Sequence, residues 1–125
     1  MAGITPTAAK DLGRQYRFVR QAHELTLRDA AKASGVSFSY VVNIEMGTRT
    51  NVSEEAYRKY GLSLQIPSPT IENMLLQARI MSALELRGLD SASRRVVWGA
   101  VADRLRELDI DVRAGFRSMI EELVG

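Results

Sequence analysis

The sequence contains few side chains that could carry out covalent chemistry. It has no cysteine, which excludes a disulfide framework, a zinc site built on thiolates and a cysteine nucleophile. His23 is the only histidine, so neither a histidine metal cluster nor a Ser-His-Asp triad is expected. Asp109 and Asp111 flank a predicted helix start, where capping explains them better than a catalytic carboxylate pair. The sequence therefore predicts a protein that is not an enzyme and that uses no metal and no cofactor.

Side chains suited to reversible recognition gather in residues 26–47, TLRDAAKASGVSFSYVVNIEMG. This stretch predicts two short helices, at about 27–33 and 38–46, joined by a turn at Gly35. Small or apolar residues are expected to form the contact between them: Ala30, Ala31, Gly35, Val36, Val41 and Ile44. The residues left outward on the second helix are Phe38, Ser39, Val42, Asn43 and Met46. A helix bound in a DNA groove reads base edges with exposed residues of its first two turns.

Apolar residues also recur at spacings of three and four in the rest of the chain, which predicts an all-α fold. The further helices are expected at about 6–23, 54–60, 69–86, 91–108 and from 111 onward. Residues with capping side chains precede the helix starts, namely Thr5, Thr26, Ser37, Ser53, and Asp90 or Ser91. Asp111 is expected to open the last helix.

The length is typical of one domain, or of a small domain with a helical extension. Gly61, Pro67 and Pro69 mark the expected boundary, which gives domains at 1–66 and 67–125. Residues 1–60 carry nine Lys or Arg and six Asp or Glu, whereas residues 61–125 carry eight and nine. This asymmetry suits a DNA-binding domain followed by an assembly domain, although an excess of this size also arises by chance.

Several segments resemble the helix-turn-helix of phage-repressor-type transcription regulators, the Cro/C1 or XRE-like family. They are GxxYRxVRQ at 13–21, AAKASGVS at 30–37 and VVNIEMGTR at 41–49, in the family's order and spacing. The resemblance covers roughly residues 12–62. It implies a lambda-repressor-like helix-turn-helix bundle followed by a helical C-terminal extension. It also implies a sequence-specific DNA-binding regulator, a repressor, with the helix 38–46 in the major groove.

The resemblance places the base-reading residues at Phe38, Ser39, Val42 and Asn43. An asparagine is suited to bidentate contact with adenine through N6 and N7, and Ser39 can donate or accept. Phe38 stands where the family usually has a polar or basic residue. It could pack on a thymine methyl group, or it could instead be a core or partner contact. Ala30 and Ser34 are smaller than is usual, so Tyr16, Phe18 and Tyr40 could fill the core.

Phosphate contacts are implied at two kinds of position. Thr26 and Ser37 match the family's capping and clamp positions, and Thr48, Arg49 and Thr50 match the loop after the recognition helix. Two residues of the first helix, Arg14 and Arg17, are further candidates for backbone contact, although a solvated helix face explains them equally well. Arg20 and Glu45 match positions that form a buried ion pair in the family, so they are assigned to structure rather than to DNA.

The C-terminal helices suggest an assembly surface. Helix-turn-helix proteins gain affinity for palindromic operators by dimerising. The residues expected in a homodimer surface or an intrachain core are Trp98, Val101, Leu105, Phe116, Met119, Ile120 and Leu123. An antitoxin or a protein-interaction module with the same fold is the alternative, and the absence of a charged, disordered tail favours self-association. Without an apolar N-terminal segment or membrane span, we expect a cytoplasmic, nucleoid-associated protein of bacterial or phage origin, and no small-molecule ligand can be inferred.

Overall fold

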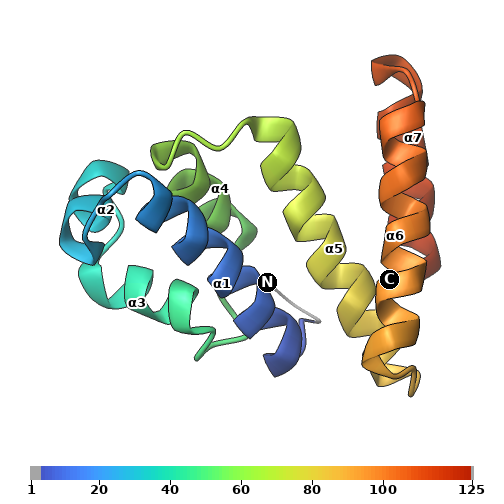
Figure 1. The fold of residues 1–125 in the computed structure, drawn as a ribbon, viewed down its shortest axis with the longest axis horizontal. Coiled ribbons are helices and arrows are strands. Elements are labelled where there is room, and N and C mark those ends of the chain that lie inside the picture. The colour runs from blue at the N-terminus through green and yellow to red at the C-terminus, as the bar shows by residue number, and fades with distance from the viewer. Residues whose placement is uncertain (1–3, 125) are drawn as a thin grey trace.

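A computed structural model of the chain describes residues 4–124. Seven α-helices lie within this range (Figure 1). They are α1 (Pro6–Ala22), α2 (Leu27–Ser34), α3 (Phe38–Met46), α4 (Glu54–Ser63), α5 (Ser68–Leu86), α6 (Ser91–Glu107) and α7 (Ile110–Val124). The expected all-α fold is confirmed, and no strand occurs within this range. None of the helices in the described part is long and apolar enough to cross a membrane.

Side-chain caps set where five of the helices begin. The capping oxygens belong to Thr5, Thr26, Ser37, Ser53 and Asp90, and each accepts a hydrogen bond from a backbone N–H in the first turn. At α2 the cap is reciprocal, because the Asp29 carboxylate also accepts from the backbone N–H of Thr26, at 3.2 Å. Hydrogen bonds from the Thr26 side chain and then from its backbone N–H lower the pKa of Asp29. The role expected of Asp111 lies outside the described side chains.

Helices α1 to α4, with the first half of α5, enclose the larger core. Three tyrosines form its centre, where the ring of Tyr16 stacks on those of Tyr57 and Tyr60 at centroid distances of 5.7 and 5.6 Å. Tyr40 is half-buried and packs against this core. Phe18 does not, because its side chain lies on the outer face of α1 and is 74% exposed. The suggestion that Phe18 fills the core is therefore wrong.

Glycines allow two close helix contacts that the sequence pattern did not indicate. A Cβ atom on Gly13 of α1 would lie 2.4 Å from the carbonyl oxygen of Ile44, so α1 and α3 cross at this glycine. Gly61 was expected at a domain boundary, but α4 continues to Ser63 and a Cβ on Gly61 would lie 2.7 Å from Cδ1 of Ile71. Gly61 is therefore a packing residue between α4 and α5 rather than a helix terminus.

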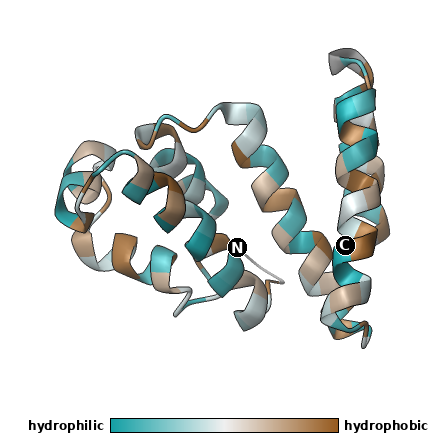
Figure 2. Ribbon diagram, viewed as in Figure 1, coloured by the Kyte–Doolittle hydropathy of each residue, from teal (hydrophilic) through white to brown (hydrophobic). Residues whose placement is uncertain are grey.

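Helix α5 is buried on two sides, and it joins the two groups of helices. Its residues Ile71, Met74, Leu75 and Ala78 belong to the core of α1–α4, whereas Leu76 and Ile80 pack with Leu105 of α6. Hydrophobic and hydrophilic segments alternate along α5 in Figure 2, where it lies between α1–α4 and α6–α7. Both α6 and α7 pack on α5.

Ion pairs reinforce this arrangement. Arg79 of α5 pairs with Glu54 of α4 and, at 2.8 Å, with Glu121 of α7. Arg58 of α4 donates to Glu72 of α5 at 2.7 Å. Charged side chains thus link α4, α5 and α7 outside the apolar contacts.

Candidate nucleic-acid interface

Helix α3 has one buried side and one open side. Val41 and Ile44 are fully buried, which fixes the rotation of the helix about its axis. Ser37 caps its start, and Gly47, with a φ of +63°, ends it. The open side carries Phe38, Ser39 and Met46, with Val42 and Asn43 half-buried beside them. The four residues expected to read bases are thus brought together on one accessible face.

Asn43 is held by a residue of the following loop. The Thr48 hydroxyl donates a hydrogen bond to Asn43 Oδ1 at 2.9 Å. The amide oxygen has a second lone pair and the amide nitrogen has two donors, so the group retains the capacity for bidentate contact. Thr48, which the sequence suggested as a phosphate contact, therefore also orients Asn43 in the unbound chain.

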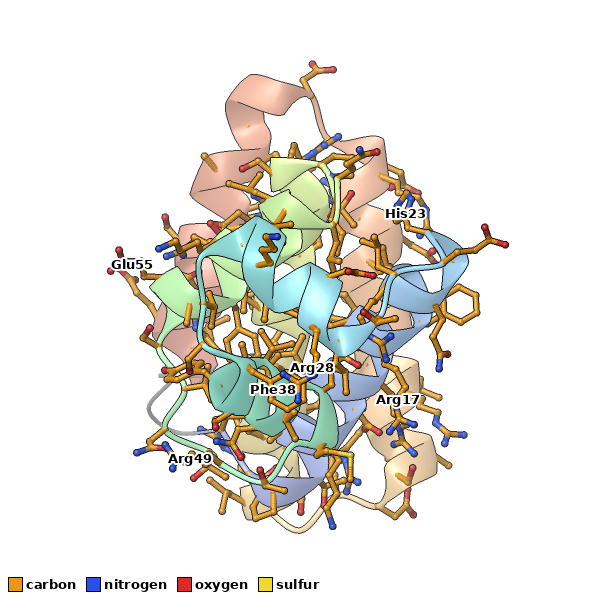
Figure 3. All side chains as sticks on the ribbon, turned by 90° about the vertical axis from the view of Figure 1, so that its left-hand side faces the viewer. Arg17, His23, Arg28, Phe38, Arg49 and Glu55 are labelled. Carbon is orange, nitrogen blue, oxygen red and sulfur yellow. The ribbon has the colours of Figure 1, made fainter. Side chains whose placement is uncertain are left out.

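Phe38 lies at the start of α3 and is 39% exposed, so it is not part of the core. The guanidinium carbon of Arg28, from the first turn of α2, lies 4.5 Å from the centroid of the Phe38 ring. Figure 3 shows the two labelled side chains together, with Arg17 on one side and Arg49 on the other. The sequence interpretation did not include Arg28. Its only sequence signal was a basic residue directly after the first residue of α2, near the cap.

The residues expected to contact phosphate lie at the helix starts and flanks. Thr26 and Ser37 are exposed, and their hydroxyls accept from the backbone N–H groups of Asp29 and Tyr40. Arg49 and Thr50 are exposed in the loop after α3.

The two arginines of α1 that were expected to contact phosphate differ in their surroundings. Arg14 pairs with Asp11 on an exposed face, which partly neutralises its charge. Arg17 extends toward the end of α3, where its Nη2 lies 3.8 Å from the sulfur of Met46. Arg17 therefore contacts the open side of α3, whereas Arg14 pairs with Asp11.

Arg20 and Glu45 form a buried ion pair. Arg20 Nε donates to Glu45 Oε2 at 2.7 Å, and the two residues are 9% and 3% exposed. Arg20 Nη1 also donates to the carbonyl oxygen of Leu25, at 2.6 Å. The hydrogen bond to Glu45 raises the pKa of Arg20, so the cation stays charged where it is buried. The pair joins α1 to the end of α3 and is largely shielded from solvent.

Tyr60 of α4 completes this group, and the sequence interpretation missed it. Its hydroxyl donates to the same carboxylate oxygen, Oε2 of Glu45. Burial, together with this hydrogen bond, raises the pKa of Tyr60. The motifs at 13–21, 30–37 and 41–49 end before α4, so they could not indicate that a tyrosine from α4 reaches the ion pair.

Comparison with known protein families identifies this part of the chain. Residues 17–68 match the family model described as Helix-turn-helix. This range contains α2, α3 and α4 whole, and it is a helix-turn-helix domain of the XRE and Cro/C1 type, as the resemblance implied. The match indicates a DNA-binding regulator, and domains of this family are typically not enzymes. No curated protein and no solved structure matches the chain.

Proposed function

We propose that the protein is a transcriptional repressor that binds a palindromic operator as a homodimer. Helix α3 enters the major groove, where Phe38, Ser39, Val42 and Asn43 contact base edges. The observation that carries this proposal is the accessible face of α3, whose rotation is fixed by the buried Val41 and Ile44. A rigidly held helix with exposed side chains in its first two turns is what direct readout requires.

Phosphate contacts would hold α3 in register. Thr26 and Ser37 lie at helix N-termini, where backbone N–H groups favour an anion. Arg17, Arg49 and Thr50 extend from elements on the flanks of α3, and Thr48 and Arg14 are further candidates. Because these groups contact the backbone, they supply affinity that depends on salt rather than sequence preference.

Dimerisation is proposed through α6 and α7. Among the described side chains of these two helices only Leu105 is buried. Together with Leu76 and Ile80 of α5 it forms a small core, against which four half-buried side chains pack: Trp98, Val101, Phe116 and Ile120. Met119 and Leu123 are 50% and 68% exposed. Apolar side chains left this open in one chain favour burial against a second copy. The proposed division is functional, with DNA binding in residues 1–66 and dimerisation in residues 67–125, because α5 packs on both parts.

Selection of bound DNA from a random pool, with light scattering for mass, tests the proposal. We expect a palindromic sequence whose half-site centres lie about one DNA turn apart, ~34 Å, and the mass of a dimer. Affinity should fall steeply as salt rises. Failure to bind any DNA at low salt would contradict the proposal and favour the protein-interaction or antitoxin alternative.

A further inference from the structure

We propose that Arg28 and Phe38 act as one reading unit, in which Arg28 contacts a guanine while Phe38 packs on the methyl group of a thymine in the adjacent base pair. This inference rests on the proposed function, since it requires α3 to lie in the major groove. It adds a specificity-determining residue from α2. It also predicts a guanine and a thymine in two neighbouring base pairs of each half-site.

The first observation is where the two residues lie. Phe38 is the first residue of α3 and Arg28 is the second residue of α2, so each follows directly on a capped helix N-terminus. Both are exposed, and they are in contact, with the guanidinium carbon 4.5 Å from the ring centroid. The cation therefore sits beside the first position of the reading face.

The second observation is that no carboxylate neutralises Arg28. Within residues 4–124 no salt bridge involves its side chain. The neighbouring carboxylate of Asp29 is turned to the backbone N–H of Thr26 and to its hydroxyl as part of the helix cap. The full charge of Arg28 is thus available to a ligand.

The chemistry of the pair follows from its geometry. A guanidinium stacked on an aromatic ring uses its face, which leaves the N–H donors at its edges free for bidentate hydrogen bonds. Guanine O6 and N7 accept such a pair of bonds in the major groove. A phenyl ring cannot hydrogen-bond a base, but it can pack on the thymine methyl group.

The separation of the two groups decides which base pairs they reach. The 4.5 Å between guanidinium and ring is close to the rise of one base-pair step, about 3.4 Å. The proposal requires the line between the two groups to run along the DNA axis, in which case their separation lets them contact neighbouring base pairs. Stacking on Phe38 also restricts the long Arg28 side chain before DNA binds, which lowers the entropy cost of the contact.

The test compares wild-type protein with Arg28→Ala, Arg28→Lys and Phe38→Leu in the full chain. Each protein is put through selection from random DNA. Affinity and its salt dependence are then measured on the wild-type site and on sites changed at one base pair. Wild type should prefer guanine at one position of each half-site by about 5- to 150-fold over other bases.

The three variants have distinct expected results. Arg28→Ala should lose the guanine preference, weaken the thymine preference at the adjacent base pair because coupling between the two side chains is reciprocal, and leave the remaining positions unchanged. Arg28→Lys should lose it too, because lysine keeps the charge but lacks the planar fork. Phe38→Leu should weaken the guanine preference although Arg28 is still present, which only a joint reading unit explains. All three should melt close to wild type, since both side chains are exposed.

Arg49→Ala is the matched comparison for a phosphate contact. It should weaken binding to all sequences alike and reduce the slope of log affinity against log salt by about 0.9. The same uniform result for Arg28→Ala would overturn the inference, and so would an unchanged guanine preference in that variant. A wild-type protein that selects no sequence would overturn the proposed function itself, which separates that failure from this one.

Discussion

At the scale of single residues, the charged side chains around α3 are either buried in an ion pair or accessible to solvent. Arg20 and Glu45 are buried against each other, while Arg17, Arg28 and Arg49 remain accessible. The family resemblance separated the first pair from the DNA contacts, because its positions match a buried ion pair. It could not indicate Arg28, since the contact of Arg28 with Phe38 depends on how α2 and α3 are oriented in space.

Replacing Glu45 by alanine should destabilise the protein far more than replacing Asn43 by alanine. The first change leaves Arg20 charged and unpaired in the interior, which costs about 3–5 kcal/mol. The second removes a hydrogen bond to Thr48 at the surface. Thermal unfolding of the two variants checks this, and equal melting temperatures would contradict the structural role of the ion pair.

Tyr60 and Tyr57 offer a matched pair of conservative changes. Tyr60→Phe removes the hydroxyl that donates to buried Glu45, and it should cost about 1–3 kcal/mol of unfolding free energy. Tyr57→Phe should be close to neutral, because in the described part of the chain its buried hydroxyl has no hydrogen-bond partner. Urea denaturation measures both. A Tyr60→Phe variant as stable as wild type would show that its hydrogen bond to Glu45 contributes little.

At the scale of helices, periodicity and caps predicted most of the fold. The expected starts at Thr5, Thr26, Ser37, Ser53 and Asp90 coincide with caps in the structure, because a capping side chain acts on its own first turn. Helix contacts were harder to predict. Gly13 and Gly61 are packing residues because of what lies opposite them, and their roles depend on Ile44 and Ile71, which are distant in sequence.

Gly13→Ala tests the crossing of α1 and α3. Its Cβ would lie 2.4 Å from the Ile44 carbonyl oxygen, and backbone must shift to admit it, so we expect a loss of about 1–3 kcal/mol. The comparison is Gly115→Ala in α7, where no atom of the described residues, apart from the chain neighbours and the helix's own backbone, lies within 4 Å of the added Cβ. That variant should be stabilised by about 0.5–1 kcal/mol through helix propensity. Melting curves that rank the two the other way would contradict this packing.

At the scale of the whole molecule, α5 joins the helix-turn-helix domain and the C-terminal helices into one connected structure. Pro67 precedes the start of α5 at Ser68 and Pro69 lies in its first turn, so the prolines indicated a helix start, while the division into two domains stays a prediction. The prolines could not show that α5 contributes to the cores of both groups of helices. A helix buried on two sides lacks a single apolar stripe, so its pattern does not reveal this role. The proposed dimer surface would therefore hold each reading helix in a fixed orientation relative to its partner.

The double substitution Met119→Glu with Leu123→Glu tests that surface. Both side chains are at least half exposed in the single chain, so the fold should survive while the dimer dissociates. Operator affinity should then fall at least tenfold, with half the mass in light scattering. Leu105→Ala is the contrast, because Leu105 is 2% exposed and its loss should cost about 2–5 kcal/mol of stability. A dimeric double variant would place the interface elsewhere.

The central claim is that the open face of α3 reads DNA, and Asn43 tests it most directly. Affinity is measured for wild type and Asn43→Ala on the selected site and on the same site with one A·T pair replaced. Wild type should discriminate against the replacement by about 5- to 150-fold, and Asn43→Ala should lose this discrimination without losing its fold. If Asn43→Ala discriminates at every position of the site as wild type does, this face of α3 does not read adenine and the account is contradicted.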